Sequence, residues 1–169
     1  GLSSAHATFV EAGELEVFRA AGWLTRMGTQ FHWQNRDYAD FDGFLSALSS
    51  RKRKAIRKER AAAQSAVRIA QISGADITAD DWDAFWVFYQ DTGARKWGQP
   101  YLTRAFFDII GDSMRDSIVL FLAYDQDGPI AGALNFVGPD CLYGRYWGCT
   151  RDVPFLHFEL CYYQAIDYA

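Results

Sequence analysis

The stretch that decides the fold is residues 117–148, SIVLFLAYDQDGPIAGALNFVGPDCLYGRYWG. It holds three runs of apolar and aromatic residues, separated by Asp127-Gly128 and by Gly138-Pro139-Asp140. These short interruptions favour tight turns, because Gly adopts positive φ and Pro presets φ. The stretch therefore predicts an antiparallel meander with strands at Ser117–Tyr124, Ile130–Val137 and Cys141–Gly148.

Helical patterns precede and follow this meander. Asp40 is placed to cap a helix whose apolar residues recur at i, i+3, i+4 and i+7. Thr78 and Asp81 form a capping-box pattern before an aromatic-rich helix. The elements predicted outside the meander are a helix over Phe41–Leu48, a basic helix through Ala66, a strand at Val67–Ile72, a helix after Thr78 (with Trp82, Phe85, Trp86 and Tyr89), a helix after Thr103 (with Phe106, Phe107 and Ile110), and a closing helix at Phe155–Ala169 with Pro154 near its first position.

The first 36 residues have a different pattern. Ala7–Val10 and Trp23–Trp33 are predicted strands, and Glu11–Ala21 is a predicted helix that stops at Gly22. This order predicts either the first strand–helix–strand of the fold or the end of a preceding unit. We therefore expect a segment at 1–36 and a mixed α/β (α+β) domain at 37–169, with a largely antiparallel central sheet flanked by helices. We also expect this domain to be C-terminally incomplete, because the chain ends inside the closing helix.

Positive charge is concentrated in one place. The chain has 17 Lys and Arg against 21 Asp and Glu, yet seven of the cations lie in residues 51–60 beside a single carboxylate, Glu59. Ten cations and 20 carboxylates remain elsewhere, so the rest of the chain is strongly acidic. Like charges at i and i+4 destabilise a helix, so this basic run needs a physical reason.

Two interpretations of the basic run are open. If Ser50 caps the helix, the first turn carries positive charge where the helix dipole disfavours it, and a bound anion relieves the conflict. The alternative is a solvated helix face that binds nothing. Under the first interpretation, the candidate anion-binding residues are Arg51, Lys52, Arg53, Lys54, Arg57 and Lys58.

Composition disfavours several classes of protein. Half of the residues are apolar and 17% are aromatic, which supports a packed core. The longest apolar run is too short to cross a bilayer, and the first ten residues lack the features of a signal peptide. Three cysteines without C-x-x-C spacing predict neither a disulfide framework nor a zinc site, and they favour a reducing, cytoplasmic location. The sequence contains no metal-spaced cluster, phosphate P-loop or Ser/His/Asp arrangement.

Three long stretches resemble a bacterial group known as FemAB-like or peptidoglycan biosynthesis/recognition proteins. The stretches are QFHWQN (Gln30–Asn35), DFDGFLSALSSRKRKAIRKER (Asp40–Arg60) and VPFLHFELCYYQAIDYA (Val153–Ala169). The group is placed in the GNAT-fold acyltransferase superfamily. The resemblance covers nearly the whole chain and implies a GNAT-like domain within a longer protein, in which this segment spans the end of one unit and most of the next.

The resemblance also implies an activity and partners. Related Fem transferases move an aminoacyl group from tRNA to the peptide of a cell-wall precursor, and both substrates are polyanionic. GNAT enzymes hold the pyrophosphate of acetyl-CoA with a loop of the form Q/R-x-x-G-x-G/A. In the matching residues 151–156, Pro154 replaces the first Gly and Leu156 replaces the second small residue. Because Pro lacks an N–H donor, this departure argues against acetyl-CoA and leaves aminoacyl-tRNA or another acyl donor, with no further cofactor expected.

Two titratable residues near the start of the closing helix are the candidate catalytic residues. His157 or Glu159 has the chemistry of a general base toward an amine nucleophile. Residues at i and i+2 do not share a helix face, so the two are not expected to form a dyad. The alternative is a first-turn charge for Glu159 and a hydrogen-bonded, half-buried imidazole for His157.

Two further groups are candidate substrate-binding residues. Tyr143, Arg145 and Trp147 alternate along the last strand and predict an aromatic–cation–aromatic row on one face. Cross-strand packing is the alternative for these side chains. Lys96 and Trp97 lie in a predicted loop that either covers a site or simply joins two helices.

Two functions follow from these expectations. The first is an acyl- or aminoacyltransferase, in which an amine of a cell-wall precursor or similar acceptor attacks the acyl donor directly, without an enzyme-bound intermediate. The second is a non-catalytic module that recognises a polyanion such as RNA or a phosphate-bearing cell-wall precursor. Only the first function predicts product formation.

Overall fold

The structure is a computed structural model that describes residues 4–95 and 100–169. The chain divides into two compact units, residues 1–34 and residues 35–169. Within the described ranges, every helix is too short or too polar to cross a lipid bilayer. The GNAT-like origin expected for the first segment stays a prediction.

The first unit contains α1 (Ala12–Ala20), close to the predicted helix. The Glu14 side chain accepts a hydrogen bond from the backbone N–H of Glu11 at 3.1 Å, which satisfies one unpaired donor at the helix start. The strands predicted at Ala7–Val10 and Trp23–Trp33 are wrong, because neither segment is paired in the sheet of the described chain. Extended sequences need a hydrogen-bonding partner to become strands. None of the described residues of this unit is buried, so β-propensity alone did not produce a sheet.

The second unit is built on a four-stranded antiparallel sheet in the order β1-β2-β3-β4. The strands are β1 (Arg68–Ser73), β2 (Ile118–Tyr124), β3 (Pro129–Val137) and β4 (Leu142–Cys149). This order confirms the predicted meander and the α+β class. β2 and β3 are almost continuously buried, as expected for strands whose two faces are both covered.

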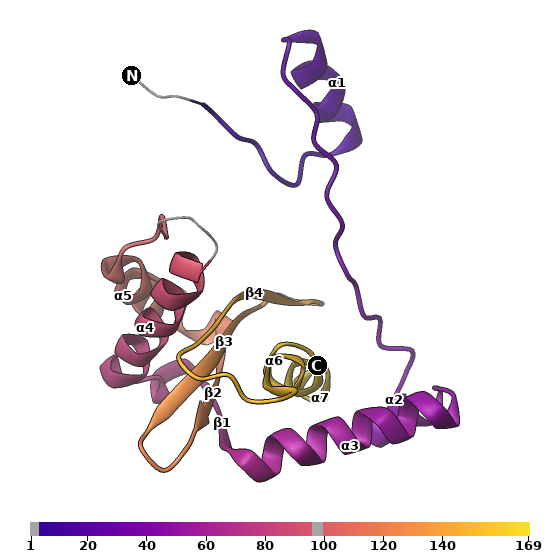
Figure 1. The fold of residues 1–169 in the computed structure, drawn as a ribbon. Helices are drawn as coiled ribbons and strands as arrows, with labels where there is room; N and C mark the ends of the chain where they lie inside the picture. Colours follow the sequence, from indigo (N-terminus) through magenta and orange to yellow (C-terminus); the bar gives the residue numbers. More distant parts are fainter. Residues whose placement is uncertain (1–3, 96–99) are drawn as a thin grey trace. The chain divides into compact units, whose positions relative to one another are not determined.

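Helices cover both faces of this sheet (Figure 1). On one face, Phe85 and Phe107 belong to a core formed with two long helices, and on the other face Leu156 and Leu160 of the closing helix pack against the strands. The helices are α2 (Phe41–Ser46), α3 (Ser50–Ala66), α4 (Ala79–Arg95), α5 (Arg104–Ser113), α6 (Leu156–Phe158) and α7 (Gln164–Tyr168), with a π-helical turn at Glu159–Tyr163 and short 3₁₀ turns at Gly74–Asp76 and Arg115–Ser117.

Local signals positioned α4 correctly. The N–H of Thr78 donates to Asp81 Oδ2 at 2.9 Å, and the N–H of Asp81 donates back to Thr78 Oγ1 at 3.3 Å, which is the predicted capping box. The helix then approaches β4 very closely at Gly148. A Cβ at that position would lie 2.1 Å from the carbonyl oxygen of Phe88, so only Gly allows this packing.

Candidate functional site

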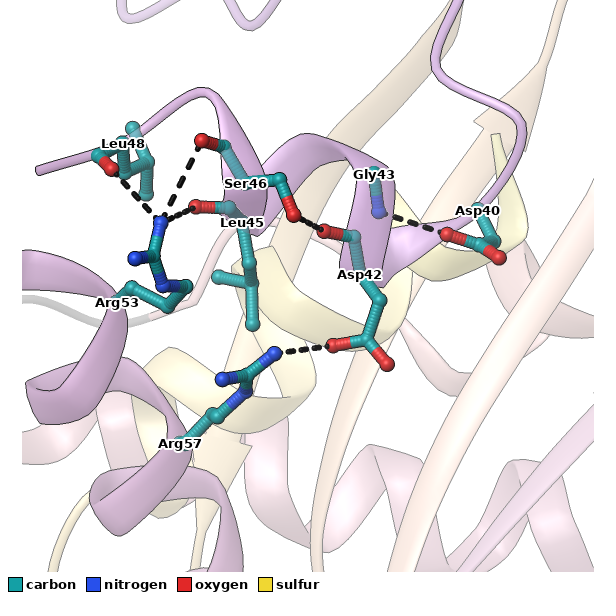
Figure 2. Close-up of polar contacts among 8 residues, drawn as sticks. All are labelled: Asp40, Asp42, Gly43, Leu45, Ser46, Leu48, Arg53 and Arg57. Atoms are coloured by element: carbon teal, nitrogen blue, oxygen red, sulfur yellow. Dashed lines mark hydrogen bonds and ion pairs between the residues drawn. The ribbon is translucent and has the colours of Figure 1, made fainter. Parts of the chain in front are cut away.

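Arg53, from the basic run, turns toward α2 (Figure 2). Its Nη1 donates to the carbonyl oxygens of Leu45, Ser46 and Leu48 at 3.5, 3.4 and 3.1 Å. Carbonyl groups at the end of a helix lack intrahelical donors and carry the negative end of the helix dipole. Arg53 therefore caps the C-terminus of α2 and joins it to α3.

Arg57 makes a second contact between the same helices. Its Nη2 lies 2.9 Å from Asp42 Oδ1, and both side chains are more than half exposed. The expected N-cap of α3, Ser50, is off by one residue, because Ser49 keeps an extended backbone and its Oγ accepts from the N–H of Lys52 at 3.4 Å. The basic run thus begins its own helix, separate from α2.

The other four predicted anion-binding cations remain on the surface. Their side chains are exposed, and none makes an ion pair with another described residue. They are Arg51, Lys52, Lys54 and Lys58. The structure therefore divides the predicted set into two structural arginines and four solvent-facing cations, and substrate binding by these residues stays a prediction.

Glu159 lies between α3 and the closing helix and is 0% exposed. Its Oε1 accepts hydrogen bonds from Nε2 of Gln64 at 2.8 Å and from Nε2 of Gln164 at 2.7 Å. Nε of Arg60 lies 3.3 Å from each carboxylate oxygen, and Nη2 of Arg60 lies 3.0 Å from Asp167 Oδ2. Within the described residues, Glu159 Oε2 has no hydrogen-bond donor. This cluster ties two helices together through one buried carboxylate.

The partners of Glu159 could not be identified from the sequence. Arg60 and Gln64 are spaced i, i+4 on α3, which places them on one face, but nothing local indicates that this face meets Glu159. Gln164 lies five residues after Glu159, a spacing that an ordinary α-helix does not bring together. The π-helical turn at Glu159–Tyr163 widens the helix and aligns positions i and i+5. The catalytic role expected for Glu159 stays a prediction. The Glu159 carboxylate has no exposed surface.

A cavity of about 440 Å³ lies where β4 ends and the closing helix begins. Its wall includes Trp147, Cys149 and His157, together with the guanidinium-bearing side chains of Arg95 and Arg151. Arg95 Nη2 donates to the carbonyl oxygen of Cys149 at 2.8 Å. The cavity therefore combines an aromatic surface, an imidazole and two arginines. Arg95 is ion-paired with Asp91, and Arg151 is ion-paired with Asp125 and Asp127.

His157 is exposed toward this cavity and packs among aromatic rings. Its ring centroid lies 5.1 Å from that of Trp147 in an edge-on arrangement, 5.6 Å from that of Phe158 and 5.9 Å from that of Tyr162. Glu159 lies on a different side of the same helix, buried against α3. The two candidate catalytic residues thus occupy separate environments, as their i, i+2 spacing predicts.

The backbone before His157 is strained. The closing helix begins at Leu156, so Pro154 lies two residues outside it and not at its first position. Phe155 separates them with a φ of 65°, a left-handed conformation that costs a non-Gly residue about 1–3 kcal/mol. A π-helical turn follows directly after α6. Such outliers are enriched at functional sites.

The predicted row on β4 is wrong because the strand contains a bulge. Gly144 and Tyr146 pair with consecutive residues of β3, so Arg145 is the extra residue. An extra residue reverses the alternation of faces, so Tyr143 lies on the α4 side and Trp147 lies on the side of the closing helix. The Arg145 guanidinium lies 4.7 Å from the centroid of the Tyr146 ring, away from Trp147.

Two other expectations concern the predicted loop with Lys96 and Trp97 and the absence of a metal-binding cluster. Lys96 and Trp97 lie outside the described residues. Among the residues that are described, no group of three or more His, Cys, Asp or Glu side chains is arranged to hold a metal ion.

A comparison of the sequence with known protein families matches it to one group. The model of the FemAB_like family, described as peptidoglycan biosynthesis/recognition, matches residues 1–169. A GNAT-fold superfamily assignment is consistent with that family. A search of curated proteins found no match. Because the family model covers the whole sequence, the chain belongs to the FemAB-like family.

Proposed function

We propose that this chain catalyses transfer of an acyl or aminoacyl group to an amine of a cell-wall precursor, in the cavity at the end of β4. The observation that carries the proposal is that cavity, about 440 Å³ in volume, in which His157 and Trp147 share a wall with Arg95 and Arg151. The family description, peptidoglycan biosynthesis/recognition, supports a cell-wall precursor as the partner.

The proposed reaction needs one proton acceptor. The acceptor amine attacks the carbonyl carbon of an acyl ester or thioester, so a C–N bond forms as the C–O or C–S bond breaks. The His157 imidazole takes the proton released by the amine and returns it to the leaving oxygen or sulfur. Arg95 and Arg151 are each more than half exposed, and they pair with Asp91 and with Asp125 and Asp127, respectively. In this proposal their remaining N–H groups contact an anionic group of the donor or acceptor.

Direct transfer is favoured over a covalent intermediate. Cys149 is the thiol on the cavity wall, and burial raises the pKa of this thiol, although the neighbouring Arg95 partly opposes the effect. A protonated thiol is a poor nucleophile. In this proposal Glu159 does not transfer a proton, and it positions the helix that carries His157.

The test is an assay of product formation with the full-length protein. The donors are bulk aminoacyl-tRNA and acetyl-CoA, the acceptor is a muropeptide precursor, and mass spectrometry detects the amide product. We expect His157→Gln to lower kcat about 100-fold or more while acceptor binding is kept. His32→Gln, at an exposed histidine of the first unit, is the matched control and should leave kcat unchanged. Unchanged activity of His157→Gln would refute the assignment.

A recognition module is the second candidate. It is favoured by the burial of Glu159, the carboxylate expected from the sequence to act as a base, which has no exposed surface. This candidate predicts precursor binding without product for every donor. Saturable binding with no amide product would select it over the transferase.

A further inference from the structure

The outer face of α3 carries four cations that the fold does not use. Arg53 and Arg57 contact α2, and Arg60 contacts Glu159, so three of the seven cations bond to other elements of the second unit. The remaining four, Arg51, Lys52, Lys54 and Lys58, make no ion pair in the described part of the chain. Their mutual repulsion is therefore not offset by neighbouring carboxylates.

These cations form an exposed row on a convex surface. Arg51, Lys54 and Lys58 follow i, i+3, i+7 spacing and share one side of the helix over about 10 Å of its axis. The exposed positions between and beyond them include Ala55 and Ala62, so this face has no aromatic ring on which a base can stack and no large apolar group. Figure 1 shows α3 as a long, straight helix at the periphery of the second unit.

The charge of the rest of the protein restricts what this row attracts. Outside residues 51–60 the chain has ten cations against 20 carboxylates, so an anionic partner is repelled from most of the molecule. The outer face of α3 lies within the densest run of positive charge in the sequence, so an approach to this face is favoured, and the asymmetry orients the protein before contact. A single small anion would need cationic groups that converge on one point, whereas these four are spread along a convex helix.

We propose that the outer face of α3 docks the protein on an anionic lipid bilayer surface, through contacts with headgroups and without insertion. A flat surface with many distributed negative charges complements a straight row of cations that lacks apolar residues. Nucleic acid is less well matched, because single-strand binders combine a basic groove with stacking aromatic side chains. The proposal is independent of whether the cavity at the end of β4 catalyses acyl transfer.

The test is co-sedimentation of the full-length protein with vesicles of phosphatidylcholine alone or mixed with phosphatidylglycerol. Each Lys or Arg near an anionic leaflet raises the partition coefficient about fivefold. We therefore expect Arg51→Glu/Lys54→Glu/Lys58→Glu to lower partitioning onto phosphatidylglycerol vesicles about 100-fold or more. The control is Arg26→Glu/Arg36→Glu/Arg115→Glu, which changes the net charge equally at exposed positions elsewhere and should change partitioning less than about fivefold.

The proposal fails if the two triple variants lose equal affinity, because net charge and not the face of α3 would then explain binding. It also fails if the protein does not sediment with anionic vesicles at low salt. A third arm measures fluorescence anisotropy with bulk tRNA and with inorganic phosphate as competitor. Tight tRNA binding without vesicle binding would assign the row to nucleic acid and overturn the lipid proposal.

Discussion

Replacing Arg60 by Met should destabilise the protein far more than an ordinary surface arginine would. Arg60 is only 14% exposed by its side chain, and its partner Glu159 is 0% exposed. The substitution leaves the Glu159 carboxylate buried with neutral amide donors alone, and breaking a buried pair in this way costs about 3–5 kcal/mol. It also removes a guanidinium that lies 4.1 Å from the centroid of the Phe41 ring.

The matched comparison is Arg57→Met, which lies three residues earlier on the same helix. Arg57 pairs with Asp42 at 2.9 Å, but the two side chains are 54% and 76% exposed. An exposed pair of this kind contributes about 0–1 kcal/mol. Urea unfolding followed by tryptophan fluorescence and circular dichroism gives the free energy of unfolding of both variants.

A double variant separates lost charge from lost packing. Glu159→Gln removes the buried negative charge, so Arg60→Met/Glu159→Gln should recover at least half of the stability that Arg60→Met loses. The reasoning is refuted if Arg60→Met costs no more than Arg57→Met, or if the two substitutions in the double variant simply add. Either result would mean that Glu159 is not held as a buried anion by Arg60.

Three other outcomes are expected. Gly148→Ala should lower the free energy of unfolding by about 1–3 kcal/mol or more, because its Cβ would lie 2.1 Å from the carbonyl oxygen of Phe88, whereas Gly28→Ala, with open space around it, should change little in the same urea titration. Burial raises the pKa of the Cys161 thiol to about 12 from an ordinary value near 9.0. The folded protein therefore keeps a proton that the unfolded chain releases, and stability falls as pH rises from about 9 to about 12. Between pH 8 and pH 10 the wild type should lose about 1 kcal/mol more than Cys161→Ala, and equal losses would contradict this. Arg53→Met removes the cap on the α2 carbonyls and should cost about 1 kcal/mol in thermal or urea unfolding; a neutral effect would show that water replaces it without loss.

Local signals predicted most of the second unit. The turn residues at Asp127-Gly128 and Gly138-Pro139-Asp140 gave three strands that the structure confirms with small shifts at their ends. The Thr78–Asp81 capping box marked the start of α4. Both signals act within a few residues, so the sequence pattern alone is sufficient to detect them.

The predicted strands at Ala7–Val10 and Trp23–Trp33 failed for the opposite reason. A strand is stable only when it pairs with another strand or packs against another element. β-propensity does not indicate whether such a partner exists. The bulge at Arg145 is a similar case. Alternation along β4 looked regular in the sequence, but the pairing with β3 inserts one residue and moves Tyr143 to the opposite face from Trp147.

The candidate site was predicted only in part. His157 was selected from its residue type and its place at the start of a helix, and the structure puts it on the wall of a cavity. The strained backbone at Phe155 and the π-helical turn after α6 left no sequence signal. Arg95 and Arg151 were not selected either, because they come from α4 and from the segment after β4, and only the fold brings both to one cavity.

The sequence by itself determined the meander, the capped helices and the location of the basic run, because periodicity, turn residues and charge density are properties of neighbouring residues. Only the tertiary structure decided which cations of that run are structural and which face solvent. Arg60 meets Glu159 across 99 positions of sequence, and Gln164 meets it only through a π-helical turn. Contacts of this kind depend on how whole helices pack against a sheet, and packing is set by the combined burial of many side chains and not by any local pattern.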